Sequence, residues 1–209
     1  MKIALDGRFP GAMCRSIPLA FRKTCYAVLL CALCCSAVVP RAGQAHLPES
    51  LAGAPVDPFK LSAGHVLVLL FVRTDCPISN RYAPTIRGLS EKFHGQADFW
   101  LVYPDRAEPA ERIRRHLEEF HYSIPALRDI HHTLVNRARA TITPECAVFD
   151  GAGKLVYHGR IDDWYEDFGR SRRLPTTHEL EDAIRSTVDG GATAPLTANA
   201  VGCYISDLK

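Results

Sequence analysis

Residues 65–80 read His-Val-Leu-Val-Leu-Leu-Phe-Val-Arg-Thr-Asp-Cys-Pro-Ile-Ser-Asn. The apolar run over 65–72 predicts a buried central β-strand, and a helical pattern begins at about Arg81. Cys76 therefore lies between the carboxyl end of a strand and the start of a helix, where nearby amide N–H groups stabilise a thiolate. Pro77 and the polar residues around the thiol favour a reactive cysteine on a surface turn over the alternative, a buried structural cysteine.

The rest of residues 46–190 alternates between extended and helical patterns, after a loose segment that ends near Leu61. Helices are predicted over 82–95, 108–122, 131–138 and 177–188, and extended segments over 97–103, 125–128, 143–149 and 154–158. The last two strands flank a hairpin turn. This order predicts one α/β sandwich domain, with helices on both sides of a central mixed sheet. The polar segment 191–209, which carries Cys203, is expected to be a flexible tail.

The first 45 residues have the pattern of a signal peptide. Basic residues precede an apolar stretch over 25–39, and Pro40 and the small-residue sequence Ala42-Gly-Gln-Ala45 follow it. This stretch is shorter than the roughly 20 residues that span a bilayer, so we expect cleavage near Ala45 and no stable membrane span. A periplasmic or secreted protein follows from this pattern. A retained membrane anchor is the alternative.

Export determines how the cysteines are interpreted. Five of the eight lie in the leader, so the mature chain keeps Cys76, Cys146 and Cys203. Three thiols form at most one disulfide within the chain, which excludes a disulfide-stapled scaffold. Residues 46–209 carry 19 Lys or Arg against 22 Asp or Glu, a formal charge of −3. This acidic balance argues against a nucleic-acid partner.

Three segments together resemble the thioredoxin-like redoxins, the broad group of thioredoxins, exported thiol–disulfide reductases and peroxiredoxins. They are Phe71-Val-Arg-Thr-Asp-Cys-Pro77 at the redox loop, Pro125-Ala-Leu-Arg-Asp129 at the start of a strand, and residues 140–155 around Thr143-Pro144, where the group has a cis-proline. The resemblance implies a thioredoxin-like sandwich over roughly residues 60–190. It also implies that Cys76 is the attacking thiolate and that Pro77, Thr143 and Pro144 contact the substrate.

The redox loop departs from each known pattern in this group. Thioredoxins have a second cysteine three residues after the first, which resolves the mixed disulfide, but Ser79 stands there in this sequence. Peroxiredoxins have Thr or Ser three residues before the cysteine and proline seven before it, and those positions are Arg73 and Leu69. Sco-type copper chaperones have a second cysteine where Asn80 stands, so we expect no copper and no other cofactor.

Because Ser79 replaces the second cysteine of the redox loop, a resolving thiol within the mature chain has to come from Cys146 or Cys203. Cys203 is the candidate resolving thiol, because the tail is expected to be mobile, and a free or structural thiol is the alternative. Cys146 lies in an apolar strand and is expected to be structural. Adjacent His131 and His132 differ by about 100° around a helix, so they do not form a metal site. The acidic stretch 162–167 is interpreted as a solvated loop or as a lip that faces a partner.

The sequence thus predicts an exported thiol–disulfide oxidoreductase with Cys76 and Cys203 as its catalytic residues. Its substrates would be protein or small-molecule disulfides, with an external thiol as reductant. A thiol peroxidase with antioxidant activity is the alternative enzyme, in which peroxide oxidises Cys76 to a sulfenic acid. A non-catalytic binding module that kept the fold is the third reading.

Overall fold

The computed structural model describes residues 46–191, 196–206 and 208. The predicted signal peptide, residues 1–45, lies outside the described residues. Within the described part of the chain, no helix is long and apolar enough to cross a membrane.

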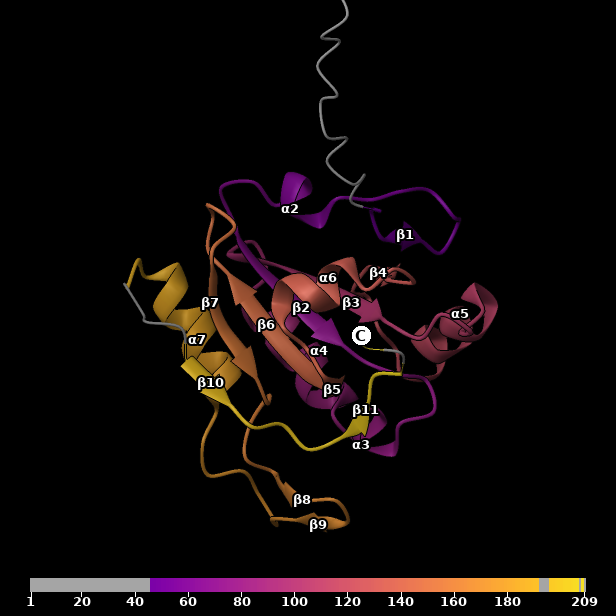
Figure 1. Ribbon diagram of the computed structural model, residues 1–209. Coiled ribbons are helices and arrows are strands. Elements are labelled where there is room, and N and C mark those ends of the chain that lie inside the picture. Colours follow the sequence, from indigo (N-terminus) through magenta and orange to yellow (C-terminus); the bar gives the residue numbers. More distant parts are fainter. Residues whose placement is uncertain (1–45, 192–195, 207, 209) are drawn as a thin grey trace, which may run out of the picture. The chain divides into compact units, whose positions relative to one another are not determined.

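A mixed sheet of seven strands forms the centre of the described domain (Figure 1). In spatial order its strands are β1 (Glu49–Ser50), β4 (Ala126–Arg128), β3 (Ala97–Tyr103), β2 (Val66–Phe71), β6 (Glu145–Phe149), β7 (Leu155–Gly159) and β10 (Leu196–Ala198). Strands β2, β3 and β4 run parallel, whereas β6 is antiparallel to β2 and β7 is antiparallel to β6. The predicted mixed sheet is confirmed, and its division into a parallel and an antiparallel side holds except at the two edges, where β1 is antiparallel to β4 and β10 is parallel to β7.

Strand β2 is buried on both faces because its side chains alternate between two hydrophobic cores. Val66, Val68 and Leu70 join the core that is completed by helices α4 (Ala83–Lys92), α5 (Ala110–Glu119) and α7 (Glu179–Val188). Leu67, Leu69 and Phe71 join the core that is completed by α6 (Thr133–Ala138) and by Phe59 of α2 (Pro58–Leu61). Burial of each such side chain stabilises the fold by about 1.5–3 kcal/mol. The central strand therefore fixes the position of the loop that follows it.

Three boundaries differ from the sequence-based prediction near the site. The helix predicted over 82–95 begins earlier, as α3 (Pro77–Arg81), because Cys76 caps it and proline suits the first helical position. The strand predicted over 143–149 is divided by the cis Thr143–Pro144 bond into β5 (Ile142–Thr143) and β6. The last helix begins at Glu179 with His178 at its N-cap, rather than with a threonine cap.

The C-terminal segment, which was expected to be flexible, contributes two described strands. Strand β10 pairs with β7 at the edge of the large sheet, and β11 (Cys203–Tyr204) pairs with β5. Figure 1 shows the yellow segment running from β10 to β11, which lies beside β5 and α3. Ile205 is buried and its N–H donates to Thr141 O at 3.0 Å, so the tail is anchored in the domain.

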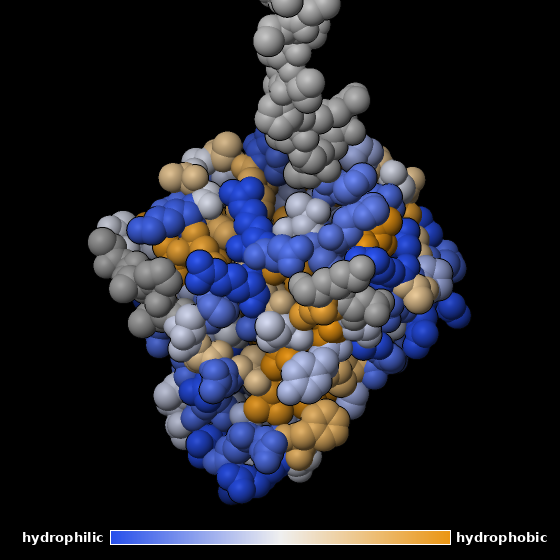
Figure 2. Space-filling view, in the orientation of Figure 1, coloured by the Kyte–Doolittle hydropathy of each residue, from blue (hydrophilic) through white to orange (hydrophobic). Residues whose placement is uncertain are grey.

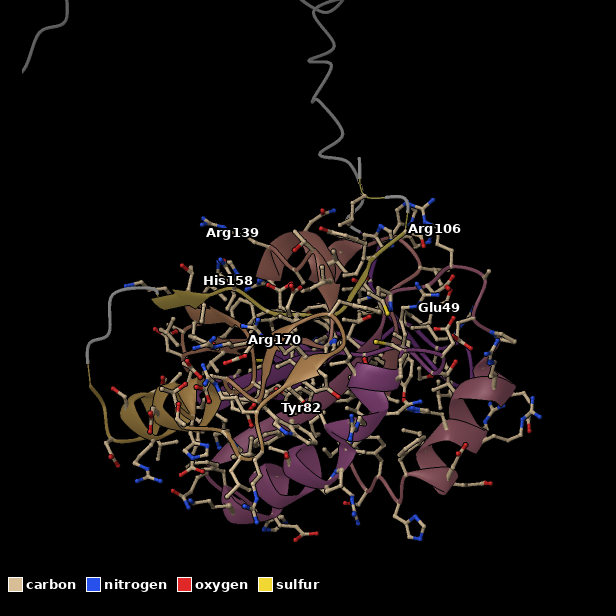
Figure 3. The ribbon with its side chains drawn as sticks, turned by 90° about the horizontal axis from the view of Figure 1, so that it is seen from below. Glu49, Tyr82, Arg106, Arg139, His158 and Arg170 are labelled. Carbon is tan, nitrogen blue, oxygen red and sulfur yellow. The ribbon has the colours of Figure 1, made fainter. Side chains whose placement is uncertain are left out.

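The acidic stretch also differs from its solvated-loop interpretation. It leads into the hairpin of β8 (Tyr165–Asp167) and β9 (Arg170–Ser171), but Asp162 and Asp163 before the hairpin are buried. Asp162 Oδ1 accepts a hydrogen bond from the Tyr82 hydroxyl at 2.6 Å, and Asp163 Oδ1 accepts one from the Thr176 amide at 2.6 Å. Figure 3 shows Tyr82 and, on the hairpin, Arg170. These buried carboxylates hold the base of the hairpin against the domain.

Candidate active site

Cys76 is held at the start of α3 by backbone groups. The Ser79 amide donates to Cys76 Sγ at 3.5 Å, and the Cys76 thiol donates to Thr143 O at 3.3 Å. Its exposed fraction is 0%, so the expectation of a cysteine on a surface turn is wrong. The turn is polar in sequence, but the thiol points inward, toward β5 and the strand that pairs with it.

The surroundings of Cys76 favour its thiolate. Burial raises the pKa of the thiol, but the hydrogen bonds around the sulfur outweigh burial and lower the pKa overall. The Ser79 amide contributes most, followed by the Ser79 side chain, the Cys203 thiol and the Ile78 amide. Ser79 Oγ is itself buried and has no partner within hydrogen-bond geometry, so the contact between Ser79 and the sulfur is made by the amide. The residue that replaces the usual second cysteine thus supports the first.

Cys203 lies directly beside Cys76. In the β5–β11 ladder Cys203 is opposite Thr143, whose hydroxyl donates to Cys203 O at 3.3 Å. Burial and the interaction with Cys76 raise the pKa of Cys203 to about 11. Both cysteines are free thiols in the structure. Both cysteines therefore lie around Thr143 but are unequal, with Cys76 as the better nucleophile and Cys203 protonated.

The predicted substrate-contact residues surround the same point. Pro77 is exposed at the first position of α3, whereas Thr143 and Pro144 are buried under the tail. The structure thus brings together Cys76, Cys203 and Thr143. The backbone of Thr143, which the sequence suggests as a docking edge, is already paired with the chain's own tail.

Charged residues fix the loop before Cys76. The Arg73 guanidinium donates to both carboxylate oxygens of Asp75 at 3.0 Å and lies 3.4 Å from Asp105 Oδ2. The Thr74 hydroxyl donates to Glu108 Oε1 at 2.9 Å. The bidentate pair of Arg73 and Asp75 fixes the shape of the loop. The contacts with Asp105 and Glu108 hold the loop against the segment between β3 and α5.

A buried histidine completes this support, and the sequence analysis missed its role. Asn80 Nδ2 donates to Thr74 O at 3.1 Å, which leaves Asn80 Oδ1 as the acceptor for His116 Nε2 at 2.9 Å. His116 Nδ1 then accepts from the Tyr103 hydroxyl at 2.8 Å. Burial lowers the pKa of His116 to about 4, so the ring is neutral near pH 7. The only signal in the sequence is a histidine on the apolar face of a predicted helix.

Cys146 is separate from this chemistry. It is fully buried, and its thiol donates to Gly159 O at 3.1 Å across the β6–β7 pair. Burial and the neighbouring Glu145 raise the pKa of Cys146 well above that of an ordinary thiol. These features fit a structural cysteine. Among the described residues, no group of three or more potential ligands could hold a metal ion.

A surface hollow of about 470 Å³ lies beside Cys203. It is lined by the tail from Ala200 to Tyr204, by Ile142 and by the tip of the β8–β9 hairpin, and Phe168 and Tyr204 are largely exposed there. Figure 2 shows apolar surface in the lower half of this face, in the region where β11 and the hairpin lie in Figure 1. Asp167 and Phe168 of the hairpin therefore form one wall of a hollow that Cys203 also lines.

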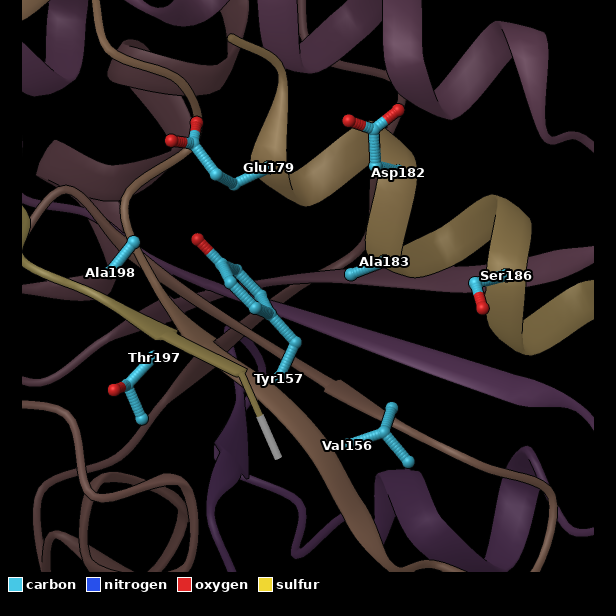
Figure 4. Close-up of a pocket in the computed structure, with 8 residues that line it drawn as sticks. All are labelled: Val156, Tyr157, Glu179, Asp182, Ala183, Ser186, Thr197 and Ala198. Atoms are coloured by element: carbon cyan, nitrogen blue, oxygen red, sulfur yellow. The ribbon is translucent and has the colours of Figure 1, made fainter. Parts of the chain in front are cut away.

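Another cavity, of about 500 Å³, lies between α7, β7 and β10 (Figure 4). Tyr157, Glu179 and Asp182 contribute its polar groups, and Glu179 is already paired with Arg160. No cysteine and no residue of the redox loop lines it. This cavity is therefore separate from the two thiols.

Solved structures define the class of fold. The chain superposes on an uncharacterized conserved protein from Geobacillus kaustophilus with a TM-score of 0.65 and 21% identity, over 77% of this chain and 88% of the other. A hypothetical protein from Sinorhizobium meliloti 1021 gives a TM-score of 0.65 and 19% identity over 76% and 88%.

The pneumococcal exposed lipoprotein thioredoxin Etrx1 from Streptococcus pneumoniae strain TIGR4 gives a TM-score of 0.50 and 16% identity over 68% and 96%. No protein-family model matches the sequence, and no curated protein matches it. The chain therefore has a thioredoxin-like fold, as the sequence predicts. At these identities the superpositions establish the fold, and the activity has to be argued from the site.

Proposed function

We propose that the protein is a thiol–disulfide oxidoreductase in which Cys76 attacks and Cys203 resolves. The observation that carries this proposal is the pairing of β11 with β5, which places Cys203 opposite Thr143, the residue whose carbonyl oxygen accepts from the Cys76 thiol at 3.3 Å. The pKa of Cys76 is lowered and that of Cys203 is raised. A thiolate beside a protonated thiol is the arrangement that two-step disulfide exchange requires. A binding module without catalysis has no need of it.

The reaction proceeds in two balanced exchanges. The Cys76 thiolate attacks one sulfur of a disulfide R–S–S–R′, which forms a mixed disulfide with R and releases R′–S⁻. Cys203 then loses its proton and attacks Cys76 Sγ, which forms the Cys76–Cys203 disulfide and releases R–S⁻. The substrate has gained two electrons and the protein has lost two. An external dithiol returns them by the reverse exchange.

The charge around the thiols gives this sequence its order. The negative charge of Cys76 is one of the causes that raise the pKa of Cys203. That charge disappears when Cys76 enters a mixed disulfide, so Cys203 loses its proton more easily at the moment when it must attack. Premature reaction of Cys203 with solvent oxidants is suppressed in the resting protein.

Export is part of the proposal. The leader pattern over 1–45 supports an oxidising compartment, the periplasm or the exterior, where disulfide substrates persist. Determination of the N-terminus of the protein recovered from bacterial cells tests this. Processing near Ala45 is expected, and an intact leader on membrane-bound protein would indicate an anchor instead.

Oxidation with a small disulfide tests the two thiol roles. The reduced chain is treated with oxidised glutathione, and each cysteine is assigned by peptide mass mapping. Wild type should form Cys76–Cys203, whereas Cys203→Ser should keep glutathione on Cys76. Cys146→Ala, which removes the buried thiol, is the matched control and should behave as wild type. Equal turnover of wild type and Cys203→Ser would show that an external thiol resolves Cys76.

The burial of Cys76 supports a thiol peroxidase as the second candidate, because a peroxide is small enough to reach a thiol from which a folded partner is excluded. The thiolate would reduce ROOH to the alcohol and become a sulfenic acid, and Cys203 would condense with it and release water. Peroxide consumption measured beside glutathione-disulfide and insulin reduction separates the two enzymes.

A further inference from the structure

Strand β11 occupies a backbone edge that would otherwise be open. It pairs antiparallel with β5, with Cys203 opposite Thr143 and Tyr204 opposite Ile142. Thr143 is the residue whose carbonyl oxygen accepts from the Cys76 thiol at 3.3 Å. An extended segment on this edge is therefore positioned against Cys76 in the way that strand addition positions a bound peptide.

Gly202 is the residue that permits this pairing. A Cβ atom at position 202 would lie 2.1 Å from Thr143 O and 2.6 Å from Thr143 C. Both are backbone atoms of the buried last residue of β5, so they cannot rotate away as a side chain would. Any side chain at this position pushes β11 away from β5.

Ile205 holds the other end of the pairing. Its side chain is buried with Leu134 and Val135 of α6, and its N–H donates to Thr141 O at 3.0 Å. Together, the glycine contact and the isoleucine anchor place the tail over the site. Cys76 has no exposed surface in this arrangement.

We propose that β11 is a built-in competitor for the segment of a partner protein that docks at Thr143, and that Gly202 determines which of the two occupies the edge. This inference deepens the proposed function, on which it rests. With the tail docked, Cys76 is covered and is reached only by an oxidant as small as hydrogen peroxide, after which it reacts with its own Cys203. Larger reagents, which include N-ethylmaleimide and protein disulfides, reach Cys76 only after the tail has undocked.

The tail thereby selects substrates by size rather than by pocket chemistry. Its weakening should raise the reactivity of Cys76 toward protein disulfides and N-ethylmaleimide more than its reactivity toward hydrogen peroxide. It should also slow formation of the Cys76–Cys203 disulfide, because Cys203 is no longer held beside its target. These opposite changes distinguish a competitor from a segment that only stabilises the fold.

Alkylation of Cys76 measures docking without any reliance on catalysis. The reduced full chain is treated with N-ethylmaleimide at neutral pH, and modification of the Cys76 peptide is followed by mass mapping. Gly202→Ala should speed this alkylation about tenfold or more, because opening of the tail limits access in wild type. Gly88→Ala is the matched control, since Gly88 is exposed on α4 and a Cβ there meets no atom within 4 Å.

Ile205→Ala provides a second, independent way to release the tail. If Gly202→Ala fails to fold, alkylation of Cys76 in Ile205→Ala tests the proposal. Faster alkylation of Cys76 in either folded variant, with no change in Gly88→Ala, supports the proposal. Alkylation as slow as in wild type in the folded variants would overturn it. If alkylation rises but no variant reduces insulin or glutathione disulfide, the tail docks as described and the proposed enzymatic function is wrong.

Discussion

Acidification should destabilise the domain through His116. The ring is buried and neutral, and its pKa falls from the ordinary 6.5 to about 4 in the folded protein. In the unfolded chain the imidazole takes up a proton below about pH 6.5, whereas in the folded chain it does not until about pH 4. The contribution of His116 to stability is therefore complete above pH 6.5 and is lost as the pH falls toward 4. A difference of about 2.5 pKa units corresponds to about 3 kcal/mol.

Other groups affect the same pH range in known directions. Burial raises the pKa values of Asp129 and Asp162, and protonation of these carboxyls favours the folded state on acidification. Glu181 has a lowered pKa, chiefly because of its hydrogen bond with Lys92, and its stabilising effect is lost as the pH falls below the ordinary glutamate range. Of these groups, His116 and Glu181 destabilise the folded state on acidification, and His116 starts to do so at the higher pH, near 6.5.

Urea denaturation at several pH values, followed by circular dichroism, measures this slope. Wild type should lose most of the 3 kcal/mol between pH 7 and about 4.5, whereas His116→Gln should be less stable at pH 7 but much less sensitive to pH. Glutamine keeps an N–H donor for Asn80 Oδ1 and cannot titrate. Parallel slopes for the two proteins would refute the assignment of a neutral, buried His116.

Two further substitutions probe the site and the edge of the sheet. Ser79→Cys in a Cys203→Ser background should restore an intramolecular disulfide at Cys76, detected by mass mapping after mild oxidation, because residue 79 lies beside the sulfur, with its amide donating to Cys76 Sγ at 3.5 Å. Failure of the double variant to gain the disulfide would contradict that placement. Gly159→Ala should lower the free energy of unfolding by roughly 2 kcal/mol or more. Gly159 has a φ of 143°, and its added Cβ would lie 2.1 Å from Ala198 O, so unchanged stability in urea would contradict the observed packing of β10.

The strands of the central sheet are predictable because their sequence signal is local. The apolar run over residues 65–72 predicts a buried strand, and β2 lies within it at Val66–Phe71. The strand predicted over 97–103 coincides with β3. A continuous apolar run is typical of a strand that is buried on both faces of a sheet, and an alternating run is typical of a strand that is buried on one face. The position of Cys76 at the end of β2 follows directly.

The tail could not be predicted in the same way, because its structure depends on residues 60 positions away. The segment over residues 201–205 is Val-Gly-Cys-Tyr-Ile. It is short and contains a glycine, so without knowledge of its partner strand it predicts a flexible tail. In the structure Gly202 provides close approach to Thr143 rather than mobility. The burial of Cys76 was missed for the same reason, since its local neighbours are polar and the segment that covers it comes from the far end of the chain.

Strand β10 has a consequence for the handling of this protein. It covers the outer edge of β7, and an uncovered edge of this kind recruits strands of other molecules and leads to aggregation. A truncation that removes both β10 and β11 would therefore yield insoluble material, and its inactivity would say nothing about the thiols. A chain that ends at Asn199 keeps the edge covered and removes Cys203. A proteolytic cut at the same place would leave the edge of β7 covered and Cys76 permanently without its covering strand.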